Sequence, residues 1–177
     1  MYSWSVGWWN WVRCETSQTF QLHYPHLIPK FEVRSLQMAK DNFHQAVVSV
    51  LENDGWKITH DGYRIMTDLL KDALTIDIGA EKLIIAEKGV NKIAVEVKSF
   101  LGDSLIYDFH GALGQLLVYK INLEIQEPDR ELFLAVPLAI YERMTQQRIF
   151  EVVAERYDVN FLVYEPVEKT IVSWVKH

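Results

Sequence analysis

Apolar and polar residues follow two different periods along this chain: a helical spacing of three to four residues and a strict alternation. The helical spacing predicts helices. After Asp41, which can cap a helix, apolar residues recur at helical spacing until Gly55, where a left-handed residue suits a helix end. The apolar stripe of this first helix consists of Phe43, Ala46, Val47, Val50 and Leu51. The same spacing predicts two further helices, over residues 104–122 and 138–157.

Between these helices, apolar runs and strict alternation predict strands. The predicted strands cover residues 56–60, 74–78, 83–86, 92–98, 131–136, 160–164 and 170–174. The dipeptide Asp61-Gly62 predicts a tight hairpin after the first strand, and Pro137 closes the strand that begins at Glu131. The early strands are joined by hairpins and the later ones through helices, which predicts an α/β sandwich with a mixed central sheet.

Residues 1–37 do not follow either period. Four of the six tryptophans lie at positions 4, 8, 9 and 11, and Pro25 and Pro29 interrupt any regular element. We therefore predict an atypical extension over 1–37, disordered or arising from a mis-assigned start, and one domain over 38–177. The other interpretation is a Trp-rich arm that docks on a membrane interface or on a partner, although few Lys or Arg residues would hold it on anionic lipid.

Composition restricts the class of protein. The single cysteine, Cys14, excludes an internal disulfide framework and fits a reducing compartment. No apolar run reaches the roughly 18 residues that span a membrane, and no secretory signal is apparent, so we expect a cytoplasmic protein without a membrane partner. The net charge of −6 argues against a protein that coats DNA through a basic surface. Any DNA binding would use a local basic patch, a bound metal or a partner protein.

The strand over 92–98 carries the residues with the most chemical potential. Glu96 and Lys98 are two apart, so their side chains leave the same face about 7 Å from each other. Asp77 ends an apolar strand 19 residues earlier and could lie beside Glu96. Two neighbouring carboxylates repel each other unless a divalent cation lies between them, and Mg²⁺ (or Mn²⁺) suits such a site. The other interpretation is an ordinary solvent-exposed strand face, where alternating charges are common.

A magnesium site of this kind is suited to phosphodiester hydrolysis. The metal would polarise the phosphoryl oxygen and help to deprotonate a water, and Lys98 would stabilise charge on the phosphate or orient that water. Gln115 and Tyr119 are four apart on the helix that follows, so they share one of its faces. Taken alone, this pair also fits an ordinary polar helix face.

The series Asp77…Glu96-x-Lys98, followed by Gln115-x-x-x-Tyr119, resembles the PD-(D/E)xK superfamily of restriction-endonuclease-like proteins. It is most similar to the RecB-like branch with a Q-x-x-x-Y motif, although an isoleucine stands in place of the proline before the first aspartate. The resemblance implies a restriction-endonuclease-like sandwich and catalytic roles for these five residues. Asp77 and Glu96 would then be the metal ligands.

A closer resemblance covers the chain from Met38 to about Trp174. It is carried by the sequence strings at 39–41, 43–47, 54–61, 77–81, 86–89, 92–100, 112–115 and 128–137. These strings are similar to the XisH family, the fdxN-element excision controlling factors found mainly in cyanobacteria. The resemblance implies control of programmed excision of a DNA element. It also implies a small XisI-type protein partner, contact with DNA and a separate site-specific recombinase.

Two main functional hypotheses follow, and the oligomeric state stays open. The first is a Mg²⁺-dependent DNA endonuclease or nickase that uses Asp77, Glu96 and Lys98. The second is a catalytically silent nuclease-fold module that acts through an XisI-type partner, which the acidic charge favours. A defence or toxin-like pair with that partner is a third. His44 could approach the site, but a structural hydrogen bond is the favoured interpretation, and Arg130 is expected to pair with a neighbouring acid.

Overall fold

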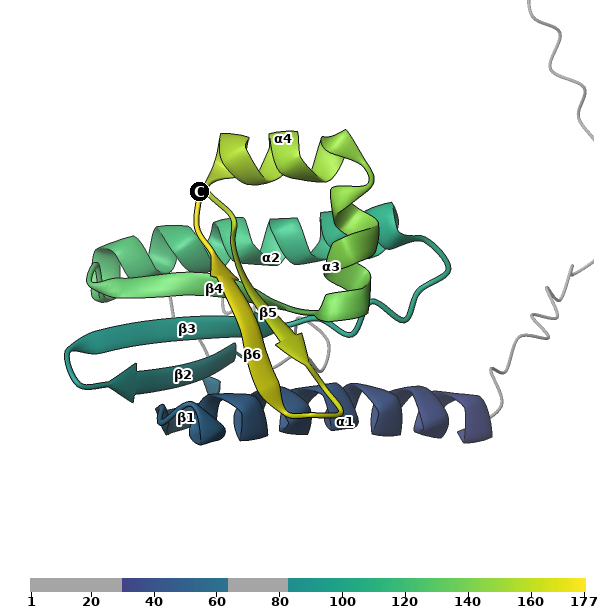
Figure 1. Cartoon of the computed structure of the whole chain (residues 1–177), viewed down its shortest axis with the longest axis horizontal. Coiled ribbons are helices and arrows are strands. Elements are labelled where there is room, and N and C mark those ends of the chain that lie inside the picture. Colours follow the sequence, from purple (N-terminus) through teal and green to yellow (C-terminus); the bar gives the residue numbers. More distant parts are fainter. Residues whose placement is uncertain (1–29, 64–82) are drawn as a thin grey trace, which may run out of the picture.

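The computed structural model describes residues 30–63 and 83–177 of the chain. Within this part, six strands form one sheet in the order β1 to β6, and helices cover both of its faces (Figure 1). The elements are α1 (Lys30–Asn53), β1 (Lys57–Tyr63), β2 (Leu83–Lys88), β3 (Asn91–Val97), α2 (Leu105–Gln126), β4 (Arg130–Pro137), α3 (Leu138–Thr145), α4 (Arg148–Tyr157), β5 (Asn160–Glu165) and β6 (Thr170–Val175).

The sheet is mixed, as the sequence predicts. β1, β2 and β3 pair antiparallel, and β5 and β6 form a second antiparallel pair. Between them β3, β4 and β5 run parallel, and their connections pass through α2 and through α3 and α4. Antiparallel strands can be joined by short turns, whereas parallel strands need crossovers, so the predicted change from hairpins to helical connections is confirmed.

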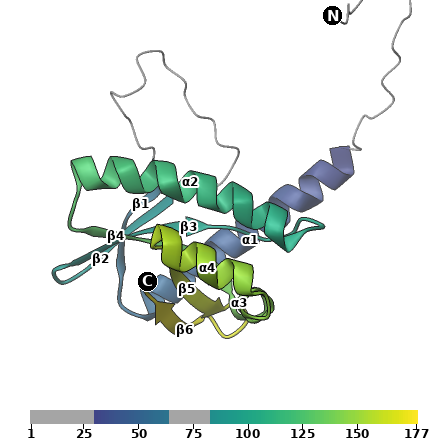
Figure 2. The same cartoon turned by 90° about the horizontal axis from the view of Figure 1, so that it is seen from above.

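The two faces of the sheet are covered by different helices (Figures 1 and 2). On one face lies α1, whose predicted stripe buries Val47, Val50 and Leu51. These residues pack against alternate strand positions that include Ile84, Val95, Ala135 and Leu162. On the other face, α2, α3 and α4 contribute Phe109, Leu116, Met144, Phe150 and Ala154. Side-chain alternation along β3 therefore decides which residues face α1 and which face α2.

The start of the first helix and the hairpin after it differ from the prediction. α1 begins at Lys30, so Asp41 lies inside the helix and does not cap its start. No tight turn occurs at Asp61-Gly62, because β1 continues through this dipeptide to Tyr63. A register shift between Asp61 and Tyr63 takes up the extra residue while the strand stays paired with β2. Pairing along the sheet therefore overrides the local turn preference of Asp-Gly.

The helix predicted over 138–157 is also wrong in one respect, because two helices replace it. A straight helix of that length would extend about 30 Å. The break after Thr145 lets Met144 on α3 and Phe150 on α4 pack into the same core. The segment contains no proline or glycine, so no local signal marks the break. Tertiary packing, rather than a helix-breaking residue, accounts for it.

Some predictions fall outside the described residues. The strand predicted over 74–78 is one of them, and the separate character of residues 1–37 stays a prediction. None of the helices in 30–63 and 83–177 is long and apolar enough to cross a membrane.

Candidate functional site

Glu96 is fully buried near the end of β3, with an exposed fraction of 0%. It pairs with Leu83 on β2 and with Leu134 on β4, both of which are also fully buried or nearly so. Ala94, two residues earlier, packs against α2, and alternation places Glu96 on the same face. A carboxylate in such a position is costly unless a cation or a hydrogen-bonding network compensates its charge.

Lys98 follows β3 directly and also lies against α2. Its Nζ atom is 3.9 Å from the position that a Cβ atom would take on Gly111, and the lysine is half-buried. The Glu96-x-Lys98 sequence thus presents both side chains to the face of the sheet that α2 covers, as the alternation predicts. The two residues differ in burial, with the carboxylate inside the core and the amine near its edge.

Tyr119 brings α2 into contact with the same part of the sheet. It is buried, and it packs in a cluster with Leu83 and Ala94. Since Leu83 is the strand partner of Glu96, Tyr119 and Glu96 border the same residue. Gln115 lies one turn earlier on α2 and is half-buried. Glu96, Lys98, Gln115 and Tyr119 each take part in at least one hydrogen bond, ion pair, ring contact or electrostatic interaction.

Asp77, the fifth predicted site residue, lies outside the described residues. Within 30–63 and 83–177, no three His, Cys, Asp or Glu side chains gather as a metal site would require. The described part therefore contributes one carboxylate, Glu96, and one amine, Lys98, to the predicted site. The second carboxylate of the predicted metal pair is that of Asp77.

The loop between β3 and α2 connects Lys98 to the start of the helix. Phe100 is buried and has a φ of 50°, which is rare for a residue with a bulky side chain. Ser104 caps α2 by accepting a hydrogen bond from the Tyr107 backbone N–H at 3.4 Å. The carboxylate of Asp108 accepts another from the Gly102 backbone N–H at 2.8 Å. These contacts define how the chain turns from Lys98 into α2.

His44 and Arg130 have structural partners. The Nε2 atom of His44 lies 2.6 Å from Asp61 Oδ1, and α1 places this pair on the opposite face of the sheet from Glu96. Arg130 is buried at the start of β4 and pairs with Glu127 at 2.6 Å and with Glu87 at 3.2 Å. Its guanidinium also donates to two backbone carbonyls of the β2–β3 hairpin. Both residues therefore have the roles that the sequence favoured: a structural hydrogen bond for His44 and pairing with neighbouring acids for Arg130.

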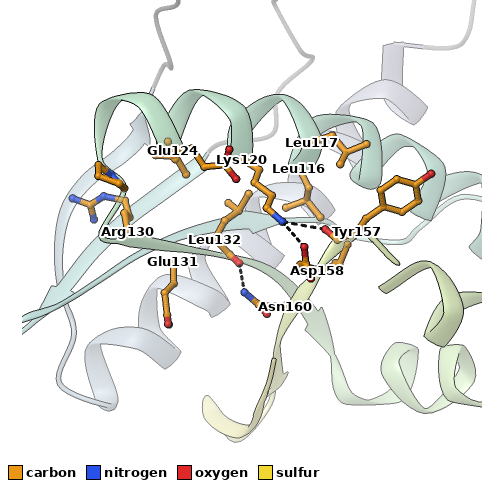
Figure 3. Close-up of a pocket in the computed structure, with 13 residues that line it drawn as sticks. Leu116, Leu117, Lys120, Glu124, Arg130, Glu131, Leu132, Tyr157, Asp158 and Asn160 are labelled. Carbon is orange, nitrogen blue, oxygen red and sulfur yellow. Dashed lines mark hydrogen bonds and ion pairs between the residues drawn. The ribbon is translucent and has the colours of Figure 1, made fainter. Parts of the chain in front are cut away.

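A cavity of about 230 Å³ lies under the second half of α2, at the amino ends of β4 and β5 (Figure 3). The Lys120 amine crosses it to pair with Asp158 at 3.0 Å, and the Asn160 amide donates to the Leu132 carbonyl at 3.2 Å. Lys120 and Asp158 carry no functional signal in the sequence, since lone charges on or beside a helix are common. Glu96 lies toward the carboxyl end of β3, so the cavity is separate from the predicted site.

Comparison with known proteins identifies the family. The family model described as XisH protein matches residues 37–172, which is more than half of the chain. This chain belongs to the XisH family. The match includes the four described site residues and the first half of β6. Among curated proteins, none matches the chain.

Two solved structures are similar to this XisH-family chain. One is an XisH family protein from Nostoc punctiforme, with 39% identity and a TM-score of 0.66 over 76% of this chain and 99% of the other. The second is a fdxN element excision controlling factor protein from Anabaena variabilis, with 40% identity and a TM-score of 0.66. It is matched over 76% of this chain and 98% of its own. The likeness thus takes in nearly the whole of both relatives.

Proposed function

We propose that this XisH-family protein is a Mg²⁺-dependent DNA endonuclease or nickase that acts in the excision of a DNA element. In this proposal Asp77 and Glu96 hold the metal, and Lys98 lies beside the phosphate that is attacked. Gln115 and Tyr119 border the site from α2. The role in excision is supported by the family and by the name of the Anabaena relative.

The burial of Glu96 is the observation that carries the proposal. An alternating Glu-x-Lys on the exposed face of a strand would be an ordinary solubilising pattern. Here the carboxylate is fully buried, and the lysine two residues later is half-buried against α2. Carboxylates are rarely buried in this way unless they serve a charge partner or a bound cation. The position therefore supports a functional role over a solubilising one.

The donor set is compatible with magnesium. Mg²⁺ takes a small number of carboxylate oxygens and keeps waters as its remaining ligands, so two carboxylates suffice. A bound magnesium supplies charge that polarises the phosphoryl oxygen and lowers the pKa of a bound water. The Lys98 amine contributes a second positive charge at the partly exposed edge of the same face, where a phosphate could approach. Glu96 would be held rigidly by its strand neighbours Leu83 and Leu134.

A second candidate function is a silent nuclease-fold module that acts through an XisI-type protein partner. The net charge of −6 favours this alternative, since it disfavours binding DNA without help. The two hypotheses make different predictions for the purified chain. The enzyme binds metal and nicks DNA by itself or once the partner is added, whereas the module does neither.

The deciding experiment combines Mg²⁺ and Mn²⁺ calorimetry with supercoiled-plasmid nicking on the full chain. We expect metal binding and nicking, and we expect Glu96→Gln and Asp77→Asn each to abolish both. Glu131→Gln is the matched control, because Glu131 is an exposed acid at the start of the neighbouring strand. Absence of binding and nicking in the unsubstituted chain, with and without the XisI-type protein, would contradict the enzyme and leave the module.

A further inference from the structure

The outward face of α2 carries an apolar stripe with regular spacing. Within it, the exposed fractions are 77% for Tyr107, 38% for Val118, 51% for Ile121 and 66% for Ile125. The positions of the stripe are Tyr107, Gly111, Gly114, Val118, Ile121 and Ile125, all of them exposed. Their separations alternate between four and three residues, which is the a/d spacing of a helix that packs on another helix.

The opposite face of α2 already packs on the sheet and on α3 and α4. The helix is therefore apolar on both sides. Between Phe109 and Gln126 its charged residues are Lys120 and Glu124, and Lys120 is paired with Asp158. A helix that is hydrophobic all round is normally buried. An exposed apolar face of this kind on a helix is typical of a surface that packs against another protein.

We propose that this face binds a second copy of the chain, with the two α2 helices antiparallel about a two-fold axis between Gly114 and Val118. The stripe has the same spacing when it is read in either direction, so an antiparallel pair aligns all six positions at once. Ile121 then lies over Gly111 of the second copy, and Val118 lies over its Gly114. At each end of the pair, Ile125 meets the tyrosine at position 107.

Side-chain size supports this pairing. Glycines occupy the first half of the stripe and branched aliphatic residues occupy the second half, so the antiparallel arrangement places each large side chain against an open position. A Cβ atom on Gly114 would meet nothing within 4 Å, and one on Gly111 would meet Lys98 Nζ at 3.9 Å, an ordinary contact distance, so both glycines have room above them. In a parallel pair, glycine would face glycine and isoleucine would face isoleucine. The helices would then be held apart at one end and underpacked at the other.

Polar side chains are also matched across the antiparallel pair. Glu124 flanks the stripe on the side of His110, and reversal of the second helix brings Glu124 alongside that copy's His110. α4, which carries the exposed Ile149 and Val152, lies on the same side of the sheet as α2 (Figure 2). The pairing is built on α2 alone, and it brings Ile121 of the second copy close to Lys98, which approaches Gly111.

The first test is the mass of the full chain by light scattering and analytical ultracentrifugation. We expect twice the monomer mass of 20.7 kDa, and we expect Ile121→Asp to give a monomer with unchanged far-UV circular dichroism. Val167→Asp is the control, since Val167 is 81% exposed in the turn between β5 and β6 and should leave the dimer intact. A monomer at all concentrations, or a dimer that survives Ile121→Asp, overturns the proposal.

The second test fixes the direction of the helices by disulfide formation in a Cys14→Ser background. With both Gly111→Cys and Ile121→Cys, the two new cysteines lie about 15 Å apart within one helix, so only a cross-link between copies can form. The antiparallel pair predicts this cross-link on oxidation. Ile121→Cys alone should stay uncross-linked, because its counterpart is about 15 Å away. Efficient cross-linking of the single variant, or none of the double variant, overturns the arrangement.

Discussion

The amino group of Lys98 lies 3.9 Å from the position that a Cβ atom would take on Gly111. The lysine follows β3 and the glycine belongs to the first half of α2, so strand end and helix approach each other with no side chain of residue 111 between them. Glu96 leaves the same face of the sheet and is fully buried. The glycine therefore leaves space for a cationic group next to a buried carboxylate.

Replacing Lys98 tests whether that cation acts on the phosphate. We expect Lys98→Ala to lower plasmid nicking by about 10²- to 10³-fold, which is the usual loss when one charge-stabilising donor is removed. Lys98→Arg should restore little of the nicking rate, because a planar guanidinium is bulkier than an amine at the place where residue 98 approaches Gly111. The measurement is the initial nicking rate, together with thermal unfolding to show that the fold is retained.

Lys92 provides the matched control for Lys98. It lies at the start of β3, at the opposite end of the strand from Lys98, shares its alternation, and is also half-buried. Lys92→Ala should leave the nicking rate within about two-fold of the unsubstituted protein, since a single distant charge is largely screened. Equal losses for both variants would mean that the two lysines act through general DNA attraction.

Arg130 should matter for stability rather than for activity. Its buried guanidinium joins the start of β4 to the β2–β3 hairpin through Glu87, Glu127 and backbone carbonyls. Arg130→Met removes these bonds and leaves both acids without this partner. Because the two acids are partly exposed, water compensates some of the loss, and we expect about 2–3 kcal/mol lower stability in urea unfolding.

Lys176→Met is the comparison for Arg130→Met. Lys176 pairs with Glu131 at 2.7 Å, but more than half of each side chain is exposed. Exposed ion pairs contribute little, so the expected loss is below about 1 kcal/mol. Similar losses for the two variants would show that burial of the arginine does not determine the strength of its network.

Local patterns were sufficient to predict most of the sheet and α2. Alternation placed Ile93, Val95 and Val97 on one face of β3, and Ser104 is the residue that caps α2. The Asp61-Gly62 turn and the continuous helix over 138–157 were wrong for one reason. In both places contacts distant in sequence, with β2 in one case and with the shared core in the other, override local preference.

The candidate site was predictable only in part. The spacing of Glu96 and Lys98 determines their common face, but it carries no information about burial, which depends on how α2 crosses the sheet. The approach of Gly111 to Lys98 could not be read from the sequence for the same reason. The role of Asp77 comes from its place at the end of a predicted strand, and those of Gln115 and Tyr119 come from a shared helix face and a resemblance; all three stay predictions.

Gly102 should be intolerant of a side chain. A Cβ atom there would lie 2.5 Å from Oδ1 of Asp108 and 2.8 Å from its Oδ2, and Oδ2 accepts the hydrogen bond from the Gly102 backbone N–H. Gly102→Ala therefore displaces Asp108 and breaks this hydrogen bond, with an expected loss of about 1 kcal/mol in chemical unfolding. Asp108→Ala should cost a similar amount. The double variant should cost no more than either one, since both remove the same bond, and full additivity would contradict this explanation.

The burial of Tyr164 predicts that the stability of the protein decreases at alkaline pH. The side chain is fully buried, its hydroxyl has no hydrogen-bond partner among the described residues, and burial raises its pKa above the usual 10.0. Above pH 10 the unfolded chain loses this proton while the folded protein keeps it. The free energy of unfolding therefore does not depend on this group below pH 10. As pH rises above 10, ionisation of Tyr164 in the unfolded chain lowers it by about 1.4 kcal/mol per pH unit.

Tyr164→Phe should remove that contribution. At pH 7 the variant should be as stable as the unsubstituted protein or more stable, because no satisfied hydrogen bond is lost and a buried polar group is removed. Between pH 10 and 11 its stability should fall less steeply, as measured by urea unfolding at half-unit steps. Tyr107→Phe is the control, since Tyr107 is 77% exposed and should leave the profile unchanged. Parallel profiles for the Tyr164→Phe variant and the unsubstituted protein would show that Tyr164 ionises equally readily in both states.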